Sequence, residues 1–228
     1  MSPAFSPYPS DSLPPTSRSQ VKRLPQRATY ERQQVYDILD EALVCHLGFV
    51  VNNQPFVIPT AYGRLDDRIY IHGSPASRML TSLEQGIDVC LTVTLLDGLV
   101  LARSAFHHSM NYRSVVLFGT AIRIDNPEEK LAALKAFTNQ VVPDRWDDVR
   151  PPSRQELAGT LVLALPIIEA SVKLRTGPPL DAAEDYNLPV WAGEIPLRLA
   201  AATAVTDPQC SPNLTFPDCV VTYCRRGK

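Results

Sequence analysis

Several absences narrow the classes of protein that this sequence can encode. No apolar run in its 228 residues approaches the roughly 20 residues of a membrane-spanning helix, so we expect no membrane partner. The formal net charge is only -2, which gives no electrostatic case for binding nucleic acid. The region after Met1 lacks an apolar stretch of the secretory type, so we do not interpret it as a signal sequence.

Familiar catalytic and metal-binding motifs are also missing. There is no G-x-G-x-x-G, Walker loop, G-x-S-x-G or H-E-x-x-H. The five cysteines are odd in number and lack metal-ligand spacing, which indicates a reducing, cytoplasmic setting. His107 and His108 are adjacent and would face opposite ways on a strand, so they make a poor zinc site and we expect no metal.

What is present suits one globular domain. The hydrophobic content of 45% is enough for a sizeable core. Proline and serine dominate residues 1–24, which predicts a disordered tail, and residues 207–228 are expected to form a looser C-terminal tail. The domain itself is therefore expected between residues 25 and 206.

Short β-rich segments with hairpin turns predict a mainly β fold with peripheral helices, closed into a small barrel. The expected strands are 45–51, 56–63, 68–72, 89–96, 99–102, 115–124 and 161–175. Asp97-Gly98 is predicted to be a hairpin turn, and the last strand is expected to bend at Pro166. The first helix is expected over residues 30–43, with Thr29 as its N-cap.

A second helix is expected to begin at Ser74-Pro75 and to end at Gly86. Ser74 suits the N-cap and Pro75 the first helical position, which places Ser77 and Arg78 in the first turn. A hydroxyl and a guanidinium at a helix start favour phosphate as the bound anion. Taken alone, the same residues also suit an ordinary helix start with a surface arginine.

Four separated motifs occur in an order that is typical of one known superfamily. They are PTAYGR, YIHGSPASRML, TVTLLDGLVLARSAFHHSMNYRSVVLFG and PVWAGEIPL. Over roughly residues 27 to 200, the chain resembles the flavin-nucleotide-binding proteins of the pyridoxamine 5'-phosphate oxidase-like superfamily. The resemblance implies an FMN-binding split β-barrel, FMN as cofactor, and a homodimer with flavin sites at its interface.

The resemblance also implies which residues bind the flavin. The backbone of one strand would meet the edge of the flavin ring, through Pro59, Thr60, Ala61 and Tyr62. The helix start would hold the phosphate, through Ser77 and Arg78. A later segment would reach the ribityl chain, the ring and the phosphate, through Ser109, Asn111, Tyr112, Arg113 and Ser114.

His72 is the candidate catalytic residue, because the nitroimidazole-resistance flavoproteins resemble this chain in having a histidine at that strand end. It could contact flavin or substrate, or it could simply be satisfied by a backbone partner. The resemblance implies an FMN-dependent oxidoreductase that acts on a small organic molecule. The alternative is a non-catalytic flavin- or haem-binding dimer.

Overall fold

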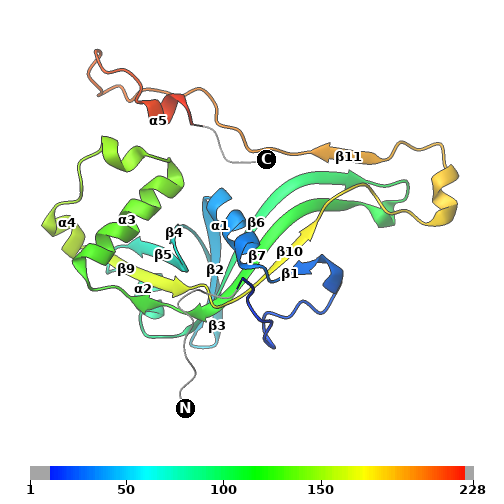
Figure 1. Ribbon diagram of the computed structural model, residues 1–228, viewed down its shortest axis with the longest axis horizontal. Helices are drawn as coiled ribbons and strands as arrows, with labels where there is room; N and C mark the ends of the chain where they lie inside the picture. The colour runs from blue at the N-terminus through cyan, green and yellow to red at the C-terminus, as the bar shows by residue number, and fades with distance from the viewer. Residues whose placement is uncertain (1–10, 224–228) are drawn as a thin grey trace.

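A computed structural model describes residues 11–223, in which two antiparallel sheets enclose the main hydrophobic core (Figure 1). The larger sheet has the order β1-β10-β7-β6-β2-β3, with β11 paired to β6 off this path. Its strands are β1 (Ala28–Thr29), β2 (Val44–Val51), β3 (Gln54–Ala61), β6 (Asp88–Leu101), β7 (Ser109–Thr120), β10 (Glu169–Arg175) and β11 (Gly193–Pro196). The smaller sheet has the order β4-β5-β9-β8. Its strands are β4 (Gly63–Leu65), β5 (Arg68–Gly73), β8 (Ile122–Arg123) and β9 (Leu161–Pro166).

Short helices surround the sheets. The α-helices are α1 (Arg32–Glu41), α2 (Arg78–Leu83), α3 (Pro127–Val141), α4 (Arg154–Ala158) and α5 (Asp218–Val221). The 3-10 helices are η1 (Pro25–Arg27), η2 (Ala105–His107), η3 (Arg145–Asp148) and η4 (Ala183–Asn187). None of the helices within residues 11–223 is long and apolar enough to cross a membrane.

The core lies between the two sheets and α1. Alternate residues of β2, including Leu47, point inward and meet Ile69 and Leu163 of the smaller sheet. Val35 and Leu39 on one face of α1 join the same cluster. The prediction of a mainly β fold with peripheral helices is therefore confirmed.

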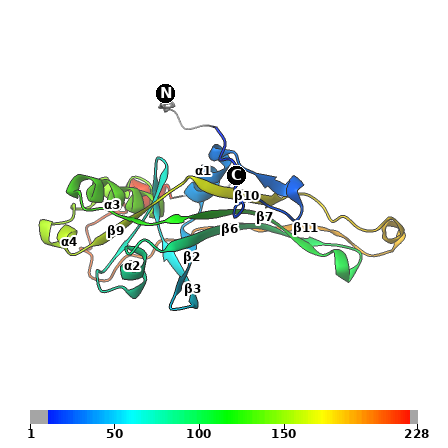
Figure 2. The same ribbon diagram turned by 90° about the horizontal axis from the view of Figure 1, so that it is seen from below.

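The hairpin of β6 and β7 projects far beyond the barrel, and β11 and η4 accompany it (Figures 1 and 2). We call residues 96–112 and 176–196 the arm. The prediction of a turn at Asp97-Gly98 is wrong, because β6 continues through a bulge there and the chain reverses at η2. Gly98 instead allows β11 to approach, since a Cβ at that position would lie 3.1 Å from the carbonyl oxygen of Ile195.

Residues 161–175 form two strands in different sheets, not one bent strand. Between β9 and β10, the amide of Ile167 donates to the carbonyl of Asp67 at 2.8 Å while Ile167 itself is fully buried. The chain crosses from one sheet to the other at this point. Local alternation of apolar residues does not reveal such a crossing.

Both predicted N-caps are displaced along the chain. Ser77 caps α2 by accepting from the amide of Leu80 at 3.4 Å, while Ser74 belongs to the preceding turn. Glu31 stands at the N-cap of α1, because Thr29 is already paired with β10 as part of β1.

The prediction of a disordered N-terminal tail is wrong for residues 11–24, and residues 1–10 lie outside the described range. Leu13 is 1% exposed and joins the main core cluster. Its amide donates to the carbonyl of Tyr30 at 2.8 Å, and Ser12 pairs with Glu31 in an isolated bridge. Proline-rich sequence can still dock on a domain when one apolar side chain finds a site in the core.

Candidate functional site

One surface of the larger sheet points away from the core, and we call it the outer face. Cross-strand partners share a face, so the strand register assigns its members. They are Val44, His46, Val57, Pro59, Ala61, Thr92, Thr94, Ser114, Val116, Ser171 and Lys173. Val44 and Val57 are 48% and 65% exposed, so this part of the outer face is open to solvent in the single chain.

The strand predicted to meet the flavin ring has the required position. β3 lies at the end of the larger sheet, which leaves backbone groups on its free edge available to a ligand. Pro59 and Ala61 belong to the outer face, whereas Thr60 pairs with the buried Cys45 and faces inward. The expected backbone contact is therefore compatible with the observed geometry.

The side chain of Tyr62 belongs to the core, so only its backbone could meet the flavin ring. It is 0% exposed, and its hydroxyl donates to the carbonyl of Leu39 at 2.5 Å. The hydroxyl of Tyr62 is therefore not available to a ligand outside the barrel.

Arg78 is an exposed cation beside this edge of the sheet. Its guanidinium lies 5.0 Å from the ring centroid of Phe56 in β3, a cation–π contact that orients it. Arg78 makes no ion pair with a carboxylate of residues 11–223. Its charge is therefore free to bind a phosphate, with Ser77 next to it.

Arg113 is in the opposite situation. Its guanidinium lies 2.5 Å from a carboxylate oxygen of Glu41 and 2.7 Å from one of Asp97. Hydrogen bonds to Asp97 and Glu41 raise the pKa of Arg113 above its already high ordinary value. A phosphate at Arg113 would meet two carboxylates, so the structure places this arginine in an internal ion-pair network.

The other residues of β7 that were predicted to contact the flavin differ in their surroundings: some are buried in the sheet and others lie at its surface. Asn111 is buried, accepts from Arg175 and donates to Glu194, so it joins three strands of the sheet. The hydroxyl of Ser114, on the outer face, donates to the carbonyl of Lys173 at 3.1 Å. Tyr112 lies two residues from Ser114 and is half-buried, and Ser109 lies within the arm, opposite Val100.

His72 lies on the smaller sheet, under α3. Its ring packs edge-to-face against Phe137, with 4.4 Å between the ring centroids. Burial lowers the pKa of His72, so the neutral imidazole is favoured. An open cleft of about 440 Å³ adjoins it, with Trp146 and Arg150 among its lining residues.

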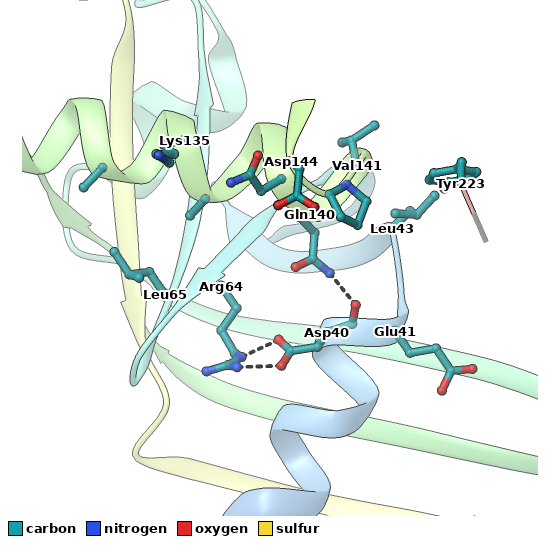
Figure 3. Close-up of a pocket in the computed structure, with 14 residues that line it drawn as sticks. Asp40, Glu41, Leu43, Arg64, Leu65, Lys135, Gln140, Val141, Asp144 and Tyr223 are labelled. Atoms are coloured by element: carbon teal, nitrogen blue, oxygen red, sulfur yellow. Dashed lines mark hydrogen bonds and ion pairs between the residues drawn. The ribbon is translucent and has the colours of Figure 1, made fainter. Parts of the chain in front are cut away.

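Another cleft, of about 490 Å³, lies between α1, β4 and α3 (Figure 3). Its polar groups bind one another: the guanidinium of Arg64 contacts Asp40 at 2.5 and 2.6 Å. Gln140 donates to the carbonyls of Leu39, Asp40 and Ala42, which satisfies the C-terminal end of α1. These contacts give the cleft a structural role.

Sequence analysis missed two features that lie near the predicted residues. His46 is exposed on the outer face, and its place between the buried Cys45 and Leu47 could have revealed this from alternation alone. At the tip of the arm, Arg103 binds the fully buried carboxylate of Asp181 at 3.0 Å. No local pattern links two residues so far apart in the sequence.

Two antiparallel sheets packed around the main core, with an open edge strand, form a split β-barrel. A sequence model described as Pyridoxamine 5'-phosphate oxidase matches residues 31–174. The chain belongs to this pyridoxamine 5'-phosphate oxidase-like family. No curated protein matches the sequence significantly.

Solved structures extend the comparison beyond the family match. The flavocytochrome Anf3 from Azotobacter vinelandii is 43% identical, with a TM-score of 0.86, over 92% of this chain and 98% of that chain. The FAD and heme binding protein from Mycobacterium smegmatis is 36% identical, with a TM-score of 0.82, over 86% of this chain and 96% of that chain. A candidate 5-nitroimidazole antibiotic resistance protein from Bacteroides thetaiotaomicron shares the fold at 24% identity, with a TM-score of 0.55, over 64% of this chain and 85% of that chain.

Proposed function

We propose that this protein is a redox protein that binds a flavin and a haem. The observation that supports this most is the 43% identity over 92% of the chain to a protein described as a flavocytochrome. A second relative, 36% identical, is described as binding both FAD and haem. The haem-binding alternative is thus favoured together with the flavin and does not replace it.

For the flavin, we assign the phosphate to Arg78 and Ser77 and the ring edge to the free edge of β3. The exposed, unneutralised guanidinium beside β3 supports this assignment, because arginine pairs bidentately with phosphate. The sequence favoured FMN, whereas the name of the Mycobacterium smegmatis relative favours FAD. Both nucleotides present a phosphate to the same arginine, and FAD adds a second phosphate and an adenosine.

We further propose a two-fold homodimer in which the partner copy covers the outer face. Three valines on the outer face support this: Val44, Val50 and Val57 have 48%, 55% and 65% of their surface accessible, and apolar side chains exposed on one face are typical of an interface. A two-fold axis would use each patch twice and create two equivalent flavin sites.

A bound flavin supplies hydride and single-electron chemistry, and the protein contributes binding and orientation. Within the proposed oxidoreductase, this chain would hold the phosphate with Arg78 and present the half-buried, neutral His72 beside the cleft under α3. The proposed substrate is a small organic molecule that accepts or donates hydride. The non-catalytic alternative keeps both cofactors without a substrate.

Absorption spectroscopy of the purified full chain tests the proposal. We expect flavin bands and a Soret band, flavin released by denaturation that chromatographs as FAD or as FMN, and bleaching of the flavin by NAD(P)H without oxygen. Flavin that stays oxidised with NAD(P)H but is reduced by dithionite would favour the non-catalytic binding protein. A preparation that binds no added flavin would contradict the proposed function, and sedimentation as a monomer with flavin bound would contradict the dimer.

A further inference from the structure

We propose that His108, at the tip of the arm, is an axial ligand of the haem iron, an inference that rests on the proposed function. The arm is where the chain extends beyond the barrel (Figure 1). Its tip consists of η2 and the residues on either side of it, from Arg103 to Met110, and it is joined to η4 through Asp181.

The match to the flavocytochrome extends further along the chain than the family match does. The family match ends at residue 174, and only 30 residues precede it. A flavocytochrome that matches 92% of the chain must therefore share much of the segment beyond residue 174, which includes η4 and β11. The segment beyond residue 174 packs on the tip that carries His108, because Asp181 binds Arg103 and the ring of Tyr186 in η4 lies 5.0 Å from the Arg103 guanidinium.

The ring of His108 is oriented as metal-ligating histidines usually are. Its Nδ1 lies 2.9 Å from the carbonyl oxygen of Ser104, and a carbonyl can only accept, so Nδ1 carries the hydrogen. The lone pair is then on Nε2, on the opposite side of an exposed ring. A hydrogen bond from Nδ1 to a backbone carbonyl is the usual second interaction that fixes the tautomer of a liganding histidine.

The other three histidines of the sequence lack this arrangement. Within the part of the chain that the structure describes, no hydrogen bond orients the rings of His46, His72 or His107. His72 packs against Phe137, and His107 packs edge-to-face against Phe106, with 5.3 Å between the centroids. The orientation of its ring thus distinguishes His108 from the adjacent His107, although both residues are histidines.

The surroundings of His108 suit a flat apolar macrocycle with acidic substituents. Phe106 is 89% exposed and Met110 52% exposed, so two apolar side chains close to His108 in the chain are accessible to a flat apolar ligand. Two buried atoms nearby, Arg103 Nε and Ser104 Oγ, have no hydrogen-bond partner in residues 11–223. Buried donors of this kind are normally satisfied, so a bound group with acceptor oxygens would complete the site.

Haem also fits better than a bare metal ion. Residues 11–223 contain no cluster of three or more His, Cys, Asp or Glu side chains that could hold an ion. A structural zinc site needs four protein ligands, whereas the porphyrin supplies four nitrogens and leaves only axial positions to the protein. One well-oriented imidazole is therefore sufficient as the protein's ligand to the haem iron.

The test compares His108→Asn with the matched variant His107→Asn in the full-length protein, titrated with haemin. Asparagine at 108 retains an amide donor near the position of Nδ1 and removes Nε2. We expect His108→Asn to weaken haemin binding by about tenfold or more and to change the Soret and electron paramagnetic resonance spectra. His107→Asn should retain the wild-type spectra, and added imidazole should restore the spectrum of His108→Asn.

As controls, flavin content and melting temperature are measured in both variants. We expect both quantities to be unchanged, which would show that any loss of haem is local to the substituted residue. As a second variant, His108→Met should bind haem with the altered spectrum of a thioether ligand. Wild-type Soret and resonance spectra in His108→Asn would overturn the ligand assignment while leaving haem binding in place. A wild-type protein that retains flavin but takes up no haemin would overturn the inference together with the haem half of the proposed function, and the flavin half would stand.

Discussion

Arg113 of β7 and Glu41 at the end of α1 are joined by two parallel hydrogen bonds, of 2.5 and 2.8 Å. Asp97, which protrudes from the bulge of β6, binds the same guanidinium at 2.7 and 2.9 Å. One arginine thus ties a helix to two strands at the base of the arm. Of the two arginines predicted to hold phosphate, only Arg78 is left unpaired among residues 11–223.

We predict that Arg113→Ala lowers the free energy of unfolding by about 1.5–3 kcal/mol, the range for hydrogen bonds to charged groups. Glu41 and Asp97, 17% and 31% exposed at the side chain, would both lose their cation. Urea denaturation measures the change. Arg123→Ala is the control, because that arginine is 52% exposed and its ion pairs should contribute under about 1 kcal/mol. Equal effects of the two substitutions would contradict a structural role for Arg113.

Arg78→Ala is predicted to weaken flavin binding by about 1.5–3 kcal/mol with little effect on stability, because the guanidinium is free of carboxylates and available to phosphate. Fluorescence titration of the flavin-free protein with FMN and with FAD gives the affinities. Arg78→Lys should retain part of the affinity, since lysine keeps the charge but not the bidentate geometry. Unchanged affinity in Arg78→Ala would place the phosphate elsewhere.

Leu13→Ala is predicted to lower the free energy of unfolding by about 2–5 kcal/mol, as expected for a buried leucine. Leu13 is 1% exposed although it lies in a proline-rich segment. Leu214→Ala is the matched control, because Leu214 is 68% exposed and should change stability by less than about 0.5 kcal/mol. A similar small effect at both positions would mean that residues 11–24 contribute little to the fold.

The lowered pKa of His72 predicts that the stability of the folded protein depends on pH. Burial lowers its pKa in the folded state, so the unfolded chain binds a proton first as the pH falls. The stability due to the neutral, buried ring is therefore complete above the unfolded pKa of about 6.5 and is lost as the pH falls toward the lower folded value. His72→Phe keeps an aromatic ring against Phe137 and removes the proton. Urea midpoints compared at about pH 8 and pH 5 should show a smaller decrease for this variant than for the wild type, and an equal decrease would assign the effect to other groups.

The sequence by itself determined the features that depend on neighbouring residues. Asn52 and Asn53 both adopt positive φ, 51° and 59°, in the hairpin turn between β2 and β3, because asparagine tolerates that conformation. Ser153 and Glu156, three residues apart, form the capping box of α4. The alternation in β2 and the order of the family motifs were likewise sufficient to predict a mainly β split barrel.

The tertiary structure alone decided which polar residues remain available to a ligand. Arg113 and Arg78 are alike as sequence, yet long-range packing gives the first two carboxylates and leaves the second without one. The side chain of Tyr62 fills the core, and Gly98 was expected in a turn and instead admits β11. Each outcome depends on contacts between strands and helices distant in the chain, and a local pattern of residue types does not encode them.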